Sequence, residues 1–291
     1  MMKRITSRQN PLVARFRAVG RGDIKDRLLL DGVHLVADAL DAGIRLRQAA
    51  VARDGGGRPD LRAIVERLQR ADVEVVAATA AVMDLLSPVR SSSAIVAIAD
   101  RPVHDDGRFY SSGNPLVIIA SDVQDPGNVG AIVRVAEAGG ATGVVAAGAC
   151  ADPYGWKALR GSMGSSLRLA VAIRDHTDQA VAQARRYGCR IVATVPRGGR
   201  SLFDVNLQAP TAALIGGEGT GLTAALVDGA DERLTIPMQA PVESLNAAVT
   251  AALIVYEARR QRTGSTDTLK TQNAKRKETE PSTEHVARST S

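Results

Sequence analysis

The sequence predicts an α/β protein made of two units, a small N-terminal one and a larger C-terminal one with a parallel sheet. Two stretches of the 291-residue chain alternate between strand-like and helix-like patterns. A polar, turn-rich stretch at residues 101–115 separates them and is expected to be a linker. A chain of this length also exceeds the usual size of one compact domain, which favours two domains.

The first unit is expected to cover residues 27–100. Short apolar runs predict its strands, and apolar residues at helical spacing between them predict its helices. A turn cluster at residues 54–59, with three glycines and a proline, separates the second strand from the following helix. We therefore expect strands at 28–30, 46–51, 73–77 and 94–99, and helices at 33–42, 61–71 and 80–86.

The second unit is expected to cover residues 116–262. Most of its strands are continuous apolar runs, as parallel strands buried on both faces should be. Strands are expected at 116–120, 143–147, 169–173, 190–195, 212–215 and 233–236. Helices are expected at 129–138, 154–163, 178–187, 223–228 and 244–261. Residues 263–291 contain almost no apolar side chains, which predicts a disordered tail.

The positive charge of the chain is concentrated at its N-terminus. Lys and Arg total 37 against 31 Asp and Glu, a net charge of +6. Residues 1–30 alone contain eight Lys or Arg and two Asp, a surplus equal to that of the whole chain. Residues 1–26 are therefore expected to form a basic arm. A charge run alone favours a solvated basic helix, and an arm that contacts phosphates is the alternative hypothesis.

Composition excludes several classes of protein. No apolar run is long enough to span a membrane, and the N-terminal sequence lacks the apolar core of a signal peptide, so a cytoplasmic protein is expected. The two cysteines and four histidines form no metal-binding motif, so no metal site is expected. Aromatic residues make up only 3%, which argues against a protein that binds single strands through rows of stacking rings.

Three segments of the second unit carry polar residues where a strand ends and a helix begins. Ligands of open α/β sheets bind beyond the carboxyl ends of the strands. The first segment, SDVQDPGNVGAIVR, covers residues 121–134. Asn128 is a suitable cap for its helix. Arg134 follows on a mostly apolar helix, so its position is equally consistent with a surface residue and with an active-site cation.

The second segment is the glycine-rich sequence LIGGEGTGL at residues 214–222. Four glycines in six residues let the backbone approach a ligand closely. The loop is therefore consistent with a nucleotide-like ligand. Its spacing fits neither G-x-G-x-x-G nor the P-loop, which argues against a redox dinucleotide and a transferred phosphoryl group. A tight turn without a ligand is the alternative. Glu218 argues against that alternative, because a turn needs no carboxylate at this position.

The third segment, IPMQAPVESLNAAV, covers residues 236–249 and leads from a strand into the last helix. Ser244 has the position of a helix N-cap, and that role alone would explain it. Ser244 and Asn246 also flank the apolar Leu245. This arrangement suits a ligand with one polar and one apolar edge.

In their order and spacing, the three segments resemble the signature motifs of the SpoU/TrmH family of RNA ribose 2′-O-methyltransferases, in the SPOUT superfamily. The matching patterns are N-x-G-x-x-x-R from Asn128, G-G-E-G-x-G from Gly216, and I-P-M followed by E-S-L-N-A-A-V from Ile236. The stretch RGSMGS at 160–165 also resembles the family, and so do ITSRQNPLV and LLLDGVHLVADAL near the N-terminus. The resemblance covers about residues 3–262.

The resemblance implies a fold, a cofactor and partners. Family members have a deep trefoil knot in their SPOUT-type parallel sheet, bind S-adenosyl-L-methionine there, and act on RNA as homodimers. The unit at 27–100 corresponds to the family's RNA substrate-binding domain. By analogy, the residues expected to bind the cofactor are Thr194, Gly216, Ile236 and Leu245. The residues expected in the catalytic site are Arg134, Ser244 and Asn246, with Asn128 and Glu218 as positioning residues.

The resemblance therefore predicts S-adenosylmethionine-dependent methylation of a ribose 2′-hydroxyl in structured RNA. The two-unit layout favours ribosomal over transfer RNA. Because arginine is effectively never deprotonated in proteins, Arg134 is expected to hold the target's phosphate and stabilise charge on the 2′ oxygen. The adjacent phosphate, water or Ser244 would then take the proton. A catalytically silent RNA-binding protein on the same scaffold is the alternative. A nucleotide-dependent oxidoreductase is disfavoured by the failed G-x-G-x-x-G pattern.

Overall fold

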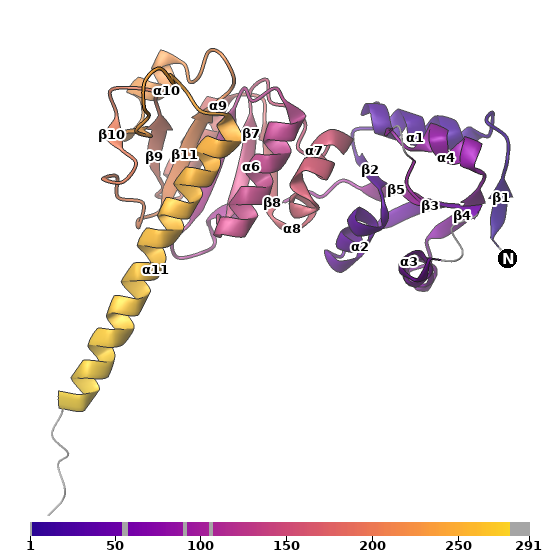
Figure 1. The fold of residues 1–291 in the computed structure, drawn as a ribbon, viewed down its shortest axis with the longest axis horizontal. Helices are drawn as coiled ribbons and strands as arrows, with labels where there is room; N and C mark the ends of the chain where they lie inside the picture. Colours follow the sequence, from indigo (N-terminus) through magenta and orange to yellow (C-terminus); the bar gives the residue numbers. More distant parts are fainter. Residues whose placement is uncertain (1, 54–57, 90–91, 105–106, 280–291) are drawn as a thin grey trace, which may run out of the picture.

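The structure, a computed structural model, describes residues 2–53, 58–89, 92–104 and 107–279 and consists of two α/β units side by side (Figure 1). The N-terminal unit is a five-stranded mixed sheet with the strand order β1-β4-β3-β5-β2. Its strands are β1 (Lys3–Ile5), β2 (Arg27–Asp31), β3 (Leu46–Ala52), β4 (Glu74–Ala78) and β5 (Ile95–Asp100). Strands β1, β4 and β3 are parallel, and β5 pairs antiparallel with β3 and β2.

Four helices cover this first sheet. They are α1 (Pro11–Arg21), α2 (Val33–Asp41), α3 (Pro59–Arg70) and α4 (Ala80–Leu86). The buried side chains of α2 and α3 pack on one face of the sheet, and those of α1 and α4 pack on the other. The four strands and three helices expected between residues 27 and 100 are all present within two residues of their predicted bounds.

The prediction of a separate basic arm at residues 1–26 is wrong. Strand β1 is an edge strand of the first sheet, with Ile5 opposite Ala78 of β4. Helix α1 follows it and buries Val13, Phe16 and Val19. Apolar residues at this spacing place one side of a helix in the core and leave the basic side chains between them in solvent. The N-terminal segment is therefore part of the first unit.

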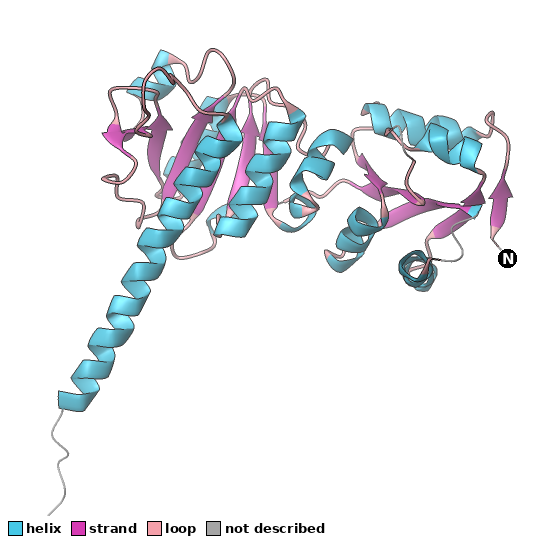
Figure 2. Cartoon of the chain, viewed as in Figure 1, coloured by secondary structure: helices cyan, strands magenta, loops and turns pink. Residues whose placement is uncertain are grey.

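The second unit is a seven-stranded sheet in which every paired strand is parallel to its neighbours (Figure 2). Its strand order is β10-β12-β9-β11-β6-β7-β8. The strands are β6 (Leu116–Ser121), β7 (Gly143–Ala147), β8 (Ala170–Arg174), β9 (Arg190–Thr194), β10 (Arg200–Ser201), β11 (Thr211–Gly216) and β12 (Glu232–Thr235). The six predicted strands are confirmed, and the two-residue β10 at the edge is additional.

Helices cover both faces of the second sheet. On one face lie α6 (Pro126–Gly139) and the start of α11 (Ala247–Thr279), and α9 (Thr177–Arg186) lies on the other (Figure 1). The short helix α10 (Ala224–Asp228) follows the glycine-rich segment. The central strand β6 is buried along its whole length, which explains its almost entirely apolar sequence.

The expected linker at 101–115 contains a packed element, with residues 105–106 outside the described part. Helix α5 (Gly107–Tyr110) buries Phe109 and Tyr110 in the second unit. Phe109 fills the space that a side chain at Gly143 would need, since a Cβ there would lie 2.3 Å from Phe109 Cδ1. The end of this stretch is therefore part of the second unit. The sequence did not predict this, because most residues of the stretch are polar.

Two short helices, α7 (Trp156–Ser162) and α8 (Ser165–Arg168), place the second unit against the first. Arg101, just after β5, donates to both carboxylate oxygens of Asp152 at 2.9 and 2.6 Å. Arg168 forms ion pairs with Asp38 of α2 at 3.1 Å and with Glu137 of α6 at 2.9 Å. The Arg101–Asp152 and Arg168–Asp38 pairs connect the two units at separate points, and the Arg168–Glu137 pair holds Arg168 within the second unit.

Helix α11 continues to Thr279, so the prediction of a disordered tail from residue 263 is wrong for residues 263–279. The first part of the helix is packed on the sheet, and a helix that is already nucleated is extended by one hydrogen bond per added residue. Lys, Gln, Ala, Arg and Glu in the extension are good helix formers. The extension projects away from the sheet (Figure 1), and residues 280–291 lie outside the described part. Within the described residues, no helix has the length and apolar content to cross a membrane.

Candidate active site

A pocket of about 450 Å³ lies beyond the carboxyl ends of β9, β11 and β12. This is the edge of a parallel sheet where ligands are expected. All four residues predicted to bind the cofactor line it: Thr194, Gly216, Ile236 and Leu245. Three residues predicted for the catalytic site line it as well: Glu218, Ser244 and Asn246. The structure therefore joins the second and third sequence segments in one cavity.

The glycine-rich segment is a loop held by backbone contacts. A Cβ on Gly216 would lie 2.5 Å from the Gly221 carbonyl carbon, and a Cβ on Gly217 would lie 2.0 Å from the Asp122 carbonyl oxygen. Neither position has room for a side chain. Gly217 and Gly221 also form an isolated β-bridge that closes the loop. The glycines thus let three stretches of backbone meet at one wall of the pocket.

A chain of hydrogen bonds connects the three sequence segments. The Nδ2 of Asn246 donates to Oδ1 of Asn128 at 2.9 Å, and the Nδ2 of Asn128 donates to Oε1 of Glu218. The direction of this chain is fixed at one end, because Oδ1 of Asn246 accepts from the backbone N–H of Ala248 at 2.8 Å. Asn246 must therefore point its amide nitrogen at Asn128. Asn128 in turn presents its own amide nitrogen to the Glu218 carboxylate.

Two helix caps differ from the sequence prediction. Asp125, not Asn128, caps α6, because its Oδ1 accepts from the backbone N–H of Asn128 at 2.9 Å and Pro126 starts the helix. Asn246, not Ser244, holds the first turn of α11. Within the described residues the Ser244 side chain is exposed, lines the pocket and makes no hydrogen bond. Its hydroxyl is thus available to a ligand.

Of the predicted site residues, Asn128 and Arg134 do not line the pocket. Asn128 is connected to it by hydrogen bonds to Glu218 and Asn246, whereas no such bond connects Arg134 among the described residues. Arg134 lies on α6, six residues beyond Asn128, which corresponds to about 9 Å along the helix axis. Its side chain is exposed, and among the described residues no carboxylate forms an ion pair with it. The Arg134 guanidinium is therefore open to solvent and is not part of the pocket lining.

Asp122 is a site residue that sequence reasoning missed. It follows β6 with a φ of 58°, a conformation that costs energy for a side chain other than glycine. Its Oδ1 accepts from the backbone N–H of Ala149 at 2.7 Å, and its backbone is the one that approaches Gly217. The only signal in the sequence was its place directly after an apolar strand, which many loop residues share.

The pocket fits a nucleoside joined to an amino acid. Its volume falls within the range of small-molecule sites, and its walls combine apolar side chains such as Ile236 and Leu245 with the polar backbone of the glycine loop. Neither cysteine lines the pocket, but Cys150 contacts the loop after β6, where its Sγ accepts from the backbone N–H of Val123. Burial raises the pKa of the Cys150 thiol, and its Sγ donates to the Ala120 carbonyl at 3.2 Å, and both disfavour the thiolate form that a nucleophile needs. Among the described residues, no three His, Cys, Asp or Glu side chains are grouped as metal ligands.

Comparison with known proteins agrees with this site. The SpoU rRNA methylase family matches residues 115–256, which include all three segments. A tRNA/rRNA methyltransferase of Synechocystis, itself uncharacterised, is 32% identical over 264 residues, 88% of this chain and 93% of its own. RlmP of Bacillus subtilis, a 23S rRNA (guanosine(2553)-2′-O)-methyltransferase, is 28% identical over 261 residues, 89% of this chain and all of its own.

A solved structure shares the whole architecture. The AdoMet-bound rRNA methyltransferase of Sinorhizobium meliloti superposes with a TM-score of 0.80 and is 26% identical, covering 89% of this chain and 98% of its own. The similarity thus extends over both units. The motifs, the parallel sheet and the relatives agree, and the chain belongs to the SpoU family of RNA methyltransferases.

Proposed function

We propose that this protein transfers a methyl group from S-adenosyl-L-methionine to a ribose 2′-hydroxyl of ribosomal RNA. The observation that carries the proposal is the pocket that the four cofactor residues line together with Glu218 and Asn246, which Asn128 connects by hydrogen bonds. The relatives support the reaction and the substrate, because RlmP is named for 2′-O-methylation of 23S rRNA and the Sinorhizobium protein binds AdoMet. A cytoplasmic location is also part of the proposal, because an enzyme that modifies ribosomal RNA must be in the compartment that contains this RNA.

The cofactor would lie with its adenosine and methionine parts against Thr194, Gly216, Ile236 and Leu245, and it supplies an electrophilic methyl group when bound. The hydrogen-bond chain holds the glycine loop against the first turns of α6 and α11. Ser244 offers an unpaired hydroxyl at the pocket wall and is a candidate to relay the proton of the 2′-hydroxyl to water or to the adjacent RNA phosphate. These roles need no metal ligand from the protein.

Arg134 is proposed to act on the RNA and not on the cofactor. An exposed arginine can bind a phosphate through two parallel hydrogen bonds, which positions the ribose and offsets negative charge on its 2′ oxygen. Arg134→Ala should therefore lose methyl transfer while the affinity for S-adenosylmethionine, measured by calorimetry, stays the same. Turnover near that of the wild type would remove Arg134 from the mechanism.

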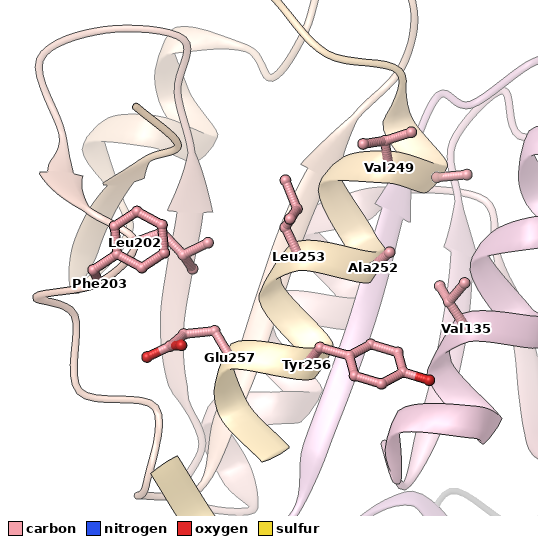
Figure 3. A pocket seen from close by; sticks show the side chains of 9 residues that line it. Val135, Leu202, Phe203, Val249, Ala252, Leu253, Tyr256 and Glu257 are labelled. Atoms are coloured by element: carbon pink, nitrogen blue, oxygen red, sulfur yellow. The ribbon is translucent and has the colours of Figure 1, made fainter. Parts of the chain in front are cut away.

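A homodimer is part of the proposal, and a groove of about 600 Å³ supports it (Figure 3). Val249, Leu253 and Tyr256 of α11 lie between Val135 of α6 and Phe203 after β10. Phe203 is 65% exposed and Tyr256 51% exposed, although both are large and apolar. Exposed apolar groups gathered on one surface mark an interaction site. The groove adjoins Val135, the neighbour of Arg134, so a second copy here would lie beside the active site.

The dimer is tested by Leu253→Asp, which places a charge in the middle of the groove. Sedimentation should show a dimer for the wild type and a monomer for the variant. The matched control is Val103→Asp, because Val103 is 93% exposed and lies outside the groove. A wild-type monomer at micromolar concentration would refute this part of the proposal.

The deep trefoil knot implied by the family resemblance also belongs to the proposal. It is supported by the parallel sheet and by the lining of one pocket from two separate loops.

The activity is tested with labelled S-adenosylmethionine and unmodified transcripts of ribosomal and transfer RNA. Label should appear in ribosomal RNA. The phosphodiester bond that follows the labelled ribose should resist alkaline cleavage, because that cleavage needs a free 2′-hydroxyl. Binding of RNA and cofactor without any transfer would favour the catalytically silent alternative. Transfer to transfer RNA alone would correct the substrate class.

A further inference from the structure

A second cavity, of about 300 Å³, lies between the two units. One wall is the end of α1 and the turn before β2, and the other is the start of α6 and of α7. Pro126, the first residue of α6, lines this cleft, and Asn128 in the same turn belongs to the hydrogen-bond chain of the active site. The first turn of α6 therefore links the cleft to the hydrogen-bond chain of the active site.

The lining of the cleft is basic and contains an indole ring. Its charged side chains are five cations and one carboxylate: Arg21, Lys25, Arg27, Arg101, Lys157 and Asp152. Two aromatic residues line it. Tyr154 is buried, and the Arg101 guanidinium lies 4.8 Å from the centroid of its ring. Trp156, the single tryptophan of the chain, is half-buried at the start of α7. The ammonium of Lys157 lies 5.6 Å from the centroid of its ring.

Ion pairs occupy most of these cations but leave two of them. Arg101 is held by Asp152, Arg21 by Asp23, and Arg27 by Asp26 and Asp100. Among the described residues Lys25 and Lys157 have no carboxylate within ion-pair distance, and both are exposed. The Arg101–Asp152 pair meanwhile fixes the two walls to each other. The cleft therefore combines two walls held together by an ion pair, two ammonium groups without an ion pair, and Trp156 as its partly exposed aromatic ring, since Tyr154 is buried under Arg101.

We propose, on the basis of the proposed function, that this cleft binds an unpaired nucleotide of the RNA next to the methylated one. The base stacks on Trp156, and the flanking phosphates contact Lys25 and Lys157. Proteins recognise unpaired RNA bases by stacking them on aromatic rings, and lysines bind the backbone that connects them. The low aromatic content of the chain agrees with one stacking position and not with a row of them.

The test uses the fluorescence of Trp156, which reports on the cleft directly because the chain has no other tryptophan. The probes are an RNA hairpin with an unpaired adenosine loop and the fully paired duplex of its stem. The hairpin should quench Trp156 strongly and the duplex weakly, because paired bases are not free to stack. Equal quenching by both, or binding of the hairpin without quenching, would overturn the proposal.

Variants separate stacking from charge. Trp156→Ala should weaken hairpin binding by at least about fivefold in fluorescence anisotropy, while Trp156→Phe keeps a ring and most of the affinity. Lys25→Ala combined with Lys157→Ala should reduce the slope of log affinity against log salt by about 0.7 per lost phosphate contact. The matched control is Arg186→Ala, an exposed cation on α9 outside the cleft. A double-lysine slope equal to that of the control would overturn the phosphate contacts.

Two further measurements keep this inference distinct from the proposed function. Affinity for S-adenosylmethionine should be unchanged in every cleft variant, which also shows that the second unit remains folded. If the wild type binds and is quenched by the hairpin but transfers no methyl group, the cleft stands and the activity fails. If methyl transfer proceeds normally in Trp156→Ala and in the double-lysine variant, the activity stands and the cleft fails.

Discussion

The hydrogen-bond chain from Asn246 through Asn128 to Glu218 makes a directional prediction. Asn128→Asp keeps the shape of the side chain but replaces the amide nitrogen that donates to Glu218 with a second oxygen. The new carboxylate still accepts from Asn246, whose own amide is fixed by the backbone N–H of Ala248. The substitution therefore damages one contact only, the one that holds the glycine loop to α6.

The size of the effect follows from the charges. Two carboxylates about 4 Å apart repel by about 1 kcal/mol in water and by about 4 kcal/mol in a partly buried site. Because Glu218 is exposed, we expect the lower part of this range, about 1–2 kcal/mol, with the lost hydrogen bond included. This corresponds to a loss of about 5- to 30-fold in S-adenosylmethionine affinity or in methyl-transfer rate.

The sharpest check is the double variant. Glu218→Gln supplies an amide donor, so in the presence of Asn128→Asp the donor and acceptor are exchanged and the contact is restored. Calorimetry and methyl-transfer kinetics on the wild type, both single variants and the double variant form a complete cycle. The double variant should lie much closer to the wild type than the sum of the single losses. Strictly additive losses would refute a direct Asn128–Glu218 contact.

Three other predictions concern stability. Asn246→Ala should lower the free energy of unfolding by about 0.5–2 kcal/mol, because it removes the cap of α11, whereas Ser244→Ala should leave thermal stability unchanged. Gly217→Ala should destabilise the protein by about 1–3 kcal/mol and weaken cofactor binding, since its Cβ would lie 2.0 Å from a backbone oxygen. Gly113→Ala, with no heavy atom within 4 Å, is the neutral control in the same calorimetric scan. The hydrogen bonds of Arg47 hold the pKa of Asp100 below its usual value. The contribution of Asp100 to stability is therefore complete above about pH 4 and is lost as the pH falls from there through its lowered pKa. The difference in chemical unfolding between the wild type and Asp100→Asn should shrink over the same range.

Local patterns predicted most of the elements but not their arrangement. Continuous apolar runs located six strands of the second sheet, because burial on both faces leaves no polar positions. The strand order has no local signal, since β6 lies between β11 and β7, and β11 follows it in the chain by about ninety residues. Helix α5 was not predicted from the sequence, because its two buried aromatic residues lie in a polar stretch and are too few to produce a helical pattern of apolar residues.

The candidate site shows the same limit. Asn128 is 90 residues from Glu218 and 118 residues from Asn246, so no spacing in the sequence connects them. The family resemblance grouped them, and the fold supplies the contacts. The resemblance also placed Arg134 in the group, whereas the structure leaves it on the outer side of α6, outside the pocket. A motif records which residues occur together but not whether they face a cofactor or an RNA.

The basic N-terminus shows why charge alone is weak evidence of function. In α1 the core takes Val13, Phe16 and Val19, so the basic residues between them face solvent whether or not the protein binds RNA. Deleting residues 1–26 would remove edge strand β1 and expose the partners of Phe16, and any loss of RNA binding would then report unfolding of the first unit. Lys25 differs because it lies after the helix, contributes nothing to the core and lines the cleft beside Trp156. A loss of RNA binding on its substitution, with stability unchanged, therefore measures recognition and not folding.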